Sequence, residues 1–246
     1  MKEAATAPAR GRLKIGSLAS VHLVVLATLM WTDEATFAWV TSTMQWLRGF
    51  RDPLTKLLST SATWNVFGSM GEAVTVLLVG WAIWKLDTKR RRLLIVLLAG
   101  SIAAGATAGV MSPLVARERP NRSGGLTRIV PLEEHLRNPR TMSFPSGHAT
   151  AAAALATFIA LAYPSLRPLA IVAAMGCAIS RVRFHKHFPS DVYAGMLIGH
   201  YTMLWIWSKL SPKLLREEEA LDLEGAESAR EWSEDVCEEM ESSAAR

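Results

Sequence analysis

The stretch SRVRFHKHFPSD, residues Ser180 to Asp191, lies between two apolar runs, 168–180 and 192–208. It places an arginine, a histidine and an aspartate at the start of the last apolar segment. Arginine offers a planar fork for phosphate oxygens, and a histidine whose ring is oriented by a carboxylate can act as a nucleophile. Pro189 is a favoured residue of a first helical turn. The stretch therefore predicts a helix from Pro189 onward, with groups suited to phosphate chemistry at its beginning.

Outward from this stretch, most of the chain consists of long runs without charged residues. At 1.5 Å per helical residue, several of them are long enough to cross a hydrocarbon core. The fold class that follows is all-α, a six-transmembrane helical bundle. The expected spans are about 15–32, 63–84, 93–116, 146–162, 166–181 and 189–208.

An interfacial helix is expected over residues 33–56, after the first span, because this segment mixes Trp39, Trp46 and Phe50 with charged residues. The alternative for residues 1–32 is a cleaved signal peptide, but the apolar run is longer than usual and no clear small-x-small site follows it. Glycines at four-residue spacing in the third and sixth spans predict that these two helices pack closely. They are Gly105 and Gly109, and Gly195 and Gly199.

Charge divides the chain into three parts. Residues 213–246 carry 12 acids and 4 bases, whereas the formal net charge of the whole chain is +5. We expect a cytoplasmic N-terminus over 1–14, a membrane domain over 15–210 and an acidic cytoplasmic tail over 211–246. A basic membrane body favours anionic lipid or phosphate, and no aromatic residues alternate with its bases to stack on nucleotides, so no nucleic-acid partner is expected. The two cysteines, Cys177 and Cys237, form no disulfide framework and have no metal-ligand spacing.

Orientation follows from one short loop. Residues 85–92, KLDTKRRR, hold five bases and one acid, whereas 33–56 balances three bases with three acids. Because basic loops stay in the cytoplasm, both termini are expected there. The segments 33–56, 117–145 and 182–188 then lie together on the extracytoplasmic face.

Two polar clusters accompany the opening stretch on that face. Arg117 to Pro120 follows the third span, and Pro145 to His148 precedes the alanine-rich fourth span. The free N–H groups and positive dipole of a helix N-terminus make the second cluster suited to an anion, and Gly147 permits close approach. A simple helix cap beside an interfacial histidine explains the same four residues.

In the opening stretch, Asp191 follows His187 by one helical turn. Its carboxylate is expected to accept from one imidazole nitrogen and to leave the other free to attack. The alternative is a histidine–aspartate pair at the membrane interface whose mutual hydrogen bond has no catalytic role. Arg119 and Arg181 are suited to phosphate oxygens, although arginines near a membrane also bind headgroups.

The three clusters together resemble the signature of the type 2 phosphatidic acid phosphatase (PAP2) family, which vanadium haloperoxidases share. The family pattern is Lys-x6-Arg-Pro, Pro-Ser-Gly-His and Ser-Arg-x5-His-x3-Asp. Here Arg119-Pro120 matches the end of the first motif, and the second and third are complete. The resemblance covers about residues 33–208 and implies a helical bundle of PAP2/haloperoxidase-like type.

The resemblance also implies a role for each matching residue. His187 is the nucleophile, Asp191 orients its ring and His148 is the proton donor that later activates water. The phosphate-binding residues it implies are Arg119, Ser146, Gly147 and Arg181. Ser112 stands where the family has its lysine. The possible substitute cations are Arg117, Arg122, Arg128 and Lys186.

The function that this resemblance implies is a membrane lipid phosphatase acting on a lipid phosphomonoester or diphosphate through a phosphohistidine. No cofactor or metal is expected, since the sequence shows no carboxylate cluster, and the site is expected on the extracytoplasmic face of a bacterial cytoplasmic membrane. A lipid phosphotransferase, a vanadium-haloperoxidase-like enzyme and a non-catalytic lipid-binding member remain alternatives. The partners are a lipid phosphate and the bilayer, and the identity of the lipid and the oligomeric state stay open. Glu72, inside the second span, and the acidic tail have no assigned role, and His22 and His200 are expected to be structural.

Overall fold

A computed structural model describes residues 15–47, 60–131, 133–134 and 142–244. Its main elements, in chain order, are α1 (Ile15–Leu47), α3 (Ser61–Ser69), α4 (Ala73–Leu86), η1 (Thr88–Arg90), α5 (Leu93–Val115), α6 (Pro120–Ser123), α8 (Gly147–Ala162), η3 (Pro164–Leu166), α9 (Arg167–Arg183) and α10 (Pro189–Ala244). Extended pairing in the described residues is limited to isolated bridges, which join Arg117 to Ile129 and Glu118 to Met142. The all-α prediction is therefore confirmed.

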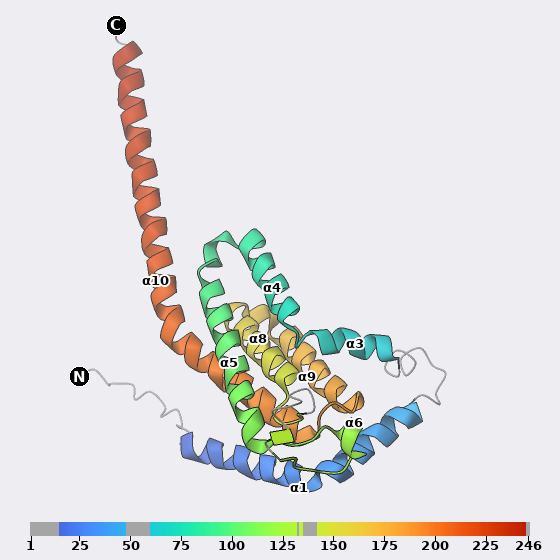
Figure 1. The fold of residues 1–246 in the computed structure, drawn as a ribbon. Helices are drawn as coiled ribbons and strands as arrows, with labels where there is room; N and C mark the ends of the chain where they lie inside the picture. Colours follow the sequence, from blue (N-terminus) through green and yellow to red (C-terminus); the bar gives the residue numbers. More distant parts are fainter. Residues whose placement is uncertain (1–14, 48–59, 132, 135–141, 245–246) are drawn as a thin grey trace, which may run out of the picture.

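The third, fourth and fifth predicted spans match α5, α8 and α9 to within two residues. The sixth begins at Pro189 as predicted, but α10 continues without a break past residue 208 to Ala244. Residues 213–244 are rich in Glu, Ala and Leu, which are strong helix formers. The tail therefore leaves the bundle as one long helical rod (Figure 1).

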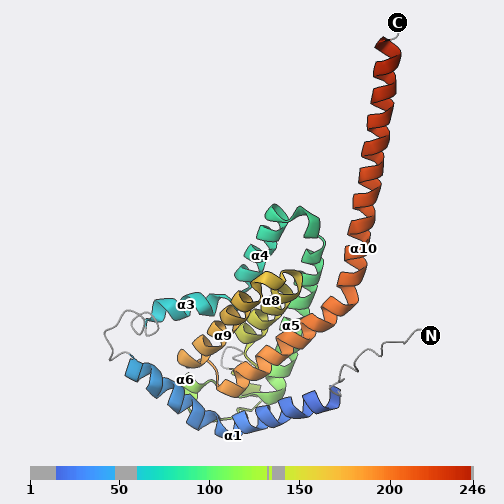
Figure 2. The same ribbon diagram turned by 180° about the vertical axis from the view of Figure 1, so that it is seen from behind.

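Two predicted boundaries are wrong. The expected span over 15–32 and interfacial helix over 33–56 are one helix, α1, as far as Leu47, and residues 48–56 lie outside the described part. Nothing in 33–47 breaks the helix, because Asp33 is buried and paired with Arg117 rather than exposed as a terminating charge. In both views α1 lies across the lower end of the bundle (Figures 1 and 2).

The expected second span consists of two helices, α3 and α4, bent by 64° at Met70–Glu72. The bend is held by close packing against α8. A Cβ at Gly71 would lie 2.3 Å from the carbonyl oxygen of His148. A straight helix with a larger residue at this position would collide with α8, so the break brings α3 beside the start of α8.

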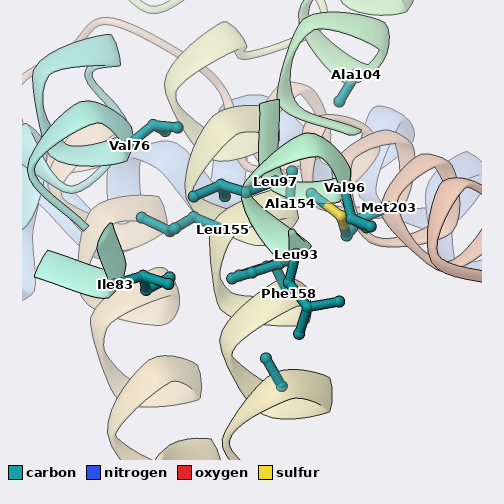
Figure 3. Close-up of a cluster of buried hydrophobic side chains, with 11 residues drawn as sticks. Val76, Ile83, Leu93, Val96, Leu97, Ala104, Ala154, Leu155, Phe158 and Met203 are labelled. Atoms are coloured by element: carbon teal, nitrogen blue, oxygen red, sulfur yellow. The ribbon is translucent and has the colours of Figure 1, made fainter. Parts of the chain in front are cut away.

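The main apolar core joins α4, α5, α8 and α10 (Figure 3). Its buried members are Val76, Ile83, Leu93, Val96, Leu97, Ala104, Ala154, Leu155, Phe158, Ala162 and Met203. A second cluster lies below it, where Phe37 of α1 packs on Val182 of α9 and on Phe188 and Val192 at the start of α10. This second cluster docks α1 against the helix ends that carry the polar motifs.

The predicted glycine contact between the third and sixth spans is wrong for these glycines. Gly105 and Gly109 have open space where a Cβ would point. Cβ atoms at Gly195 and Gly199 would instead lie 2.5 Å from the carbonyl oxygen of Ser146 and 2.1 Å from that of Thr150, both on α8. Small residues allow membrane helices to approach closely. Here they press α10 onto the N-terminal half of α8.

The chain is a membrane protein by the length and apolar character of its helices. Among the described residues, three helices are long and apolar enough to cross a bilayer, within Leu18–Leu47, Leu93–Val115 and Pro164–Arg183. The bent pair of α3 and α4 is a fourth if it forms one span, and α8 is a shorter apolar helix. The count of six spans stays a prediction.

Candidate active site

The three sequence clusters meet at one end of the bundle, where α8 begins, α9 ends and α10 begins, beside the loop that follows α5 (Figure 1). The segment after α9 folds back on it. The backbone N–H groups of Lys186 and His187 donate to the carbonyl oxygen of Arg181, at 3.0 and 3.3 Å. His185 takes the left-handed conformation (φ 55°) that this reversal requires. Residues 180–191 thus form a compact turn between α9 and α10, which we call the corner.

Ser146 caps α8, and its neighbours face the site. The Ser146 hydroxyl accepts from the N–H of Ala149 at 3.4 Å, while its own N–H donates to the carbonyl oxygen of Asp191 at 2.9 Å. Ser146 is buried, whereas Gly147 is exposed and His148 is partly buried. The N–H of Gly147 is one of the helix's first donors, which lack partners within the helix. The start of α8 is therefore an open anion cradle.

Arg119 and Arg181 converge on this cradle from two other elements. Nε of Arg119 donates to the carbonyl oxygen of Met142 at 2.8 Å. Burial and the neighbouring charge of Arg181 both lower the pKa of Arg119. Nε of Arg181 is buried and has no hydrogen-bond partner among the described residues. Two close, half-buried guanidinium groups repel each other, and an anion between them would relieve that repulsion.

His187 is buried beside these arginines. Its Nδ1 lies 2.6 Å from the carbonyl oxygen of Ser143. A carbonyl oxygen can only accept, so Nδ1 carries the proton, and in the neutral ring Nε2 keeps its lone pair. Burial lowers the pKa of His187 well below 6.5, and the charges of Arg119 and Arg181 lower it further. The ring is therefore held neutral with one nitrogen available for attack.

Asp191 does not orient His187 in the way the sequence predicted. The carboxylate accepts from the Phe188 N–H at 2.7 Å, the Ser143 hydroxyl at 2.5 Å and Nη1 of Arg117 at 2.9 Å. The predicted contact assumed helical spacing, but α10 begins at Pro189, after His187. Asp191 therefore caps the start of α10, and it reaches His187 only through Ser143.

Arg117 completes a buried network that the sequence did not reveal. Its Nη1 bonds Asp33 of α1 at 2.7 Å and the Ser190 hydroxyl at 2.8 Å, besides Asp191. The guanidinium stacks 3.9 Å from the ring centre of Phe188. Asp33 also accepts from the backbone and hydroxyl of Ser190. Arg117 thus binds carboxylates behind His187, and the structure does not place it as a substitute phosphate ligand.

The other candidate cations are placed differently. Arg128 is 67% exposed and lies 3.9 Å from Glu118, and Arg122 is exposed, although its charge reaches Arg119. Lys186 is half-buried in the corner, and its charge reaches His148. The hydroxyl of Ser112 donates to the sulfur of Met142 at 3.0 Å.

Glu72, which had no role from sequence, caps α4 at the bend and is exposed, with its charge reaching both His148 and Arg181. His22 and His200 were expected to have structural roles, and each forms hydrogen bonds to a neighbouring helix. His22 lies 2.8 and 2.7 Å from the hydroxyls of Tyr193 and Tyr201, and His200 lies 2.8 Å from that of Thr157. Within the described ranges, no three histidine, cysteine or acidic side chains are grouped so as to hold a metal ion.

Comparison with known proteins indicates a family of phosphatases. A family model described as the PAP2 superfamily matches residues 93–214. The chain is 33% identical over 126 residues to decaprenylphosphoryl-5-phosphoribose phosphatase of Mycobacterium tuberculosis, covering 49% of this chain and 66% of that protein. It is 31% identical over 105 residues to lipid A 1-phosphatase of Rhizobium etli, covering 42% of this chain and 44% of that protein. The chain thus spans less than two thirds of either relative.

The fold is similar to that of a solved membrane phosphatase. The solved structure is the crystal structure of the first transmembrane PAP2 type phosphatidylglycerolphosphate phosphatase from Bacillus subtilis, which is 21% identical with a TM-score of 0.52. The similarity covers 78% of this chain and 94% of that one. At this identity it shows the fold alone.

Proposed function

The chain belongs to the PAP2 superfamily, and on this premise we propose that it hydrolyses a lipid phosphomonoester or diphosphate through a phosphohistidine on His187. The observation that carries the proposal is the pairing of a neutral, buried histidine with two convergent arginines. Nδ1 of His187 donates to the Ser143 carbonyl, so Nε2 is the nucleophile. Nε of Arg181 is buried and has no hydrogen-bond partner within the part of the chain that the structure describes, as expected for a group that binds an anion.

In the first step, Nε2 of His187 attacks phosphorus, and the bond to the lipid oxygen breaks. His148 donates a proton to the departing oxygen, which leaves as the lipid alcohol or, from a diphosphate, as the lipid monophosphate. In the second step, His148 takes a proton from water, and the hydroxide displaces His187 and releases phosphate. The nucleophile returns to its starting state, and His148 is protonated for the next cycle.

The arginines supply the charge that stabilises this transfer. Arg119, Arg181 and the Gly147 N–H bind the equatorial phosphate oxygens, where negative charge is spread in the transition state. Ser146 caps α8 by accepting from the Ala149 N–H, and its hydroxyl proton is left to donate to a phosphate oxygen. Because fixed guanidinium groups carry the charge, we expect turnover to persist in excess chelator.

The substrate is a lipid because the site opens at the end of a membrane bundle. We place this end on the extracytoplasmic face of a cytoplasmic membrane. The basic loop 85–92 and the start of the acidic tail are joined by the 2.8 Å ion pair of Arg92 and Glu217. The loop and the start of the tail lie at the end of the bundle opposite the site (Figure 1). Basic loops stay in the cytoplasm, which favours this orientation.

The test is phosphate release from a panel of lipid phosphates and diphosphates by the full-length protein in detergent. Wild type is expected to release phosphate and to form a trappable phosphoenzyme, and His187→Ala to do neither. His185→Gln is the matched control, since His185 is an exposed histidine of the same loop, and it is expected to keep both. Equal phosphate release by wild type and His187→Ala would overturn the assignment. Adding a primary alcohol separates hydrolysis from phosphotransfer by the product formed.

A further inference from the structure

The nucleophile's loop is tied to α1 by a continuous chain of buried hydrogen bonds. The Ser143 carbonyl accepts from Nδ1 of His187 at 2.6 Å, and the Ser143 hydroxyl donates to Asp191 at 2.5 Å. Asp191 accepts from Arg117 at 2.9 Å, and Arg117 donates to Asp33 at 2.7 Å. Asp33, Arg117, Ser143, Asp191 and His187 are all buried. We call this chain the α1 relay.

We propose that Asp33 is a positioning residue for phosphoryl transfer, which acts through the α1 relay to hold Nε2 of His187 in line with phosphorus. This proposal rests on the function proposed above. Asp33 lies outside residues 93–214, which match the family model. The catalytic motifs are therefore completed by a helix that comes before the matched segment.

The geometry requires the carboxylate of Asp33 and not merely a polar side chain. Its Oδ1 accepts from the Ser190 N–H at 2.9 Å, and its Oδ2 accepts from both Arg117 Nη1 and the Ser190 hydroxyl. In Asp33→Asn the amide oxygen can keep the first bond. The NH₂ group then faces the N–H of Arg117, so two donors meet. This mismatch pushes Arg117 away from α1, and the bond between Arg117 and Asp191 carries the displacement to that carboxylate.

The charge balance of the network gives a second reason. Arg117 is a single buried cation between two carboxylates, Asp33 and Asp191. Removing the cation leaves two buried carboxylates that repel each other, whereas removing Asp33 as well relieves that repulsion. The effects of changing Asp33 and Arg117 are therefore coupled, with a sign that can be measured.

A matched control lies next to Asp33 on the same helix. Glu34 is exposed, and its carboxylate accepts from the Thr127 N–H at 2.7 Å. Glu34 thus also joins α1 to the loop after α5 through Thr127, whose hydroxyl accepts from Nη2 of Arg117 at 2.8 Å, but Glu34 itself bonds no member of the α1 relay. Glu34→Ala removes a docking contact of α1 and leaves the α1 relay intact.

The experiment compares these variants as full-length purified proteins, using the lipid that wild type cleaves best. For Asp33→Asn we expect kcat to fall by about 10- to 100-fold, as for an ångström-scale misplacement of the attacking atom. KM should stay within about twofold, because the phosphate-binding arginines are untouched. Glu34→Ala should keep the wild-type kcat.

Two inhibitors separate positioning from general loss of structure. Inorganic vanadate bonds to the nucleophile, so Asp33→Asn should weaken its inhibition by about tenfold. Inorganic phosphate is held by the arginines, so its inhibition should not change. A purely structural role for Asp33 would weaken both inhibitors equally or leave kcat per folded molecule unchanged, and either result would overturn the proposal.

A double variant keeps the test decisive if Asp33→Asn does not fold. Asp33→Asn with Arg117→Met removes a buried anion together with its cation, and it should be more active than Arg117→Met alone. Equal or lower activity of the double variant overturns the relay. If wild type itself cleaves none of the lipids, the proposed function fails. The relay alone fails if three results occur together: wild type cleaves the lipids, His187→Ala does not cleave them, and Asp33→Asn is as active as wild type.

Discussion

Gly199→Ala tests whether the close crossing of α8 and α10 builds the site. A Cβ at Gly199 would lie 2.1 Å from the carbonyl oxygen of Thr150 and 2.9 Å from the N atom of Ala154. The first distance is about 1.3 Å shorter than the 3.4 Å at which ordinary van der Waals contact begins. Both obstacles are backbone atoms, so a rotamer change cannot relieve the overlap, and the helices must move apart by about an ångström.

That displacement has two measurable effects. Overpacking of this kind costs about 1–3 kcal/mol, and each kcal/mol lowers the unfolding temperature by roughly 2–4 °C in a chain of this size. Moving α8 away from α10 also shifts His148 relative to His187, because His148 is on α8 and His187 directly precedes α10. A misplacement of about 1 Å can cost about 100-fold in rate.

The assay is thermal unfolding in detergent together with phosphate release. Gly109→Ala is the matched control, because Gly109 of α5 is exposed and no atom of the described residues lies within 4 Å of the added Cβ. Alanine favours a helix by up to about 1 kcal/mol over glycine, so the control should be at least as stable as wild type and fully active. If Gly199→Ala behaves like Gly109→Ala, the crossing does not set the site geometry.

Three further predictions concern the pH profile, the missing cation and the orientation. The pKa of His187 is lowered well below 6.5, so His187 stays neutral as pH falls through 6.5. The acid limb of the kcat/KM profile should therefore have its midpoint below pH 6.5. A midpoint at 6.5 or above contradicts this. Lys186→Met should raise KM for the lipid and weaken phosphate inhibition, whereas Arg128→Met should change neither, and equal effects would show that Lys186 does not serve the phosphate. In a Cys237→Ser background, an impermeant maleimide applied to intact cells should label Arg128→Cys but not Lys89→Cys, and the reverse pattern would place the site on the cytoplasmic face.

Local sequence was sufficient for those helices whose ends are set by their own residues. The bounds of α5 follow from Arg92 before it and Arg117 after it, and α9 starts at Arg167-Pro168. The two wrong boundaries depend on contacts from elsewhere. Asp33 resembles the end of an apolar run until it is paired with Arg117, and the bend at Gly71 arises from packing on His148. No window of neighbouring residues contains either partner.

The candidate site divides in the same way. Motif spacing identified the histidines and arginines that meet, because each lies at a helix end on one face. It did not identify their connections. The i,i+4 argument for His187 and Asp191 assumed a helix through both, but α10 begins between them. The acceptor that fixes the ring is a backbone carbonyl, that of Ser143, and a backbone carbonyl has no residue signature.

The charges around the site favour Lys186 over Arg117 as the replacement for a lysine at residue 112, which is a serine here. Arg117, the nearest cation in sequence, already lies between Asp33 and Asp191, and moving it to the phosphate would leave two buried carboxylates uncompensated. Among the described residues, Lys186 forms no ion pair with a buried carboxylate. Lys186 is half-buried, and it directly precedes the nucleophile His187. Its backbone N–H donates to the carbonyl oxygen of Arg181. Its charge reaches His148, and we therefore propose that Lys186 takes the place of the missing lysine and stabilises the charge that develops on the phosphate.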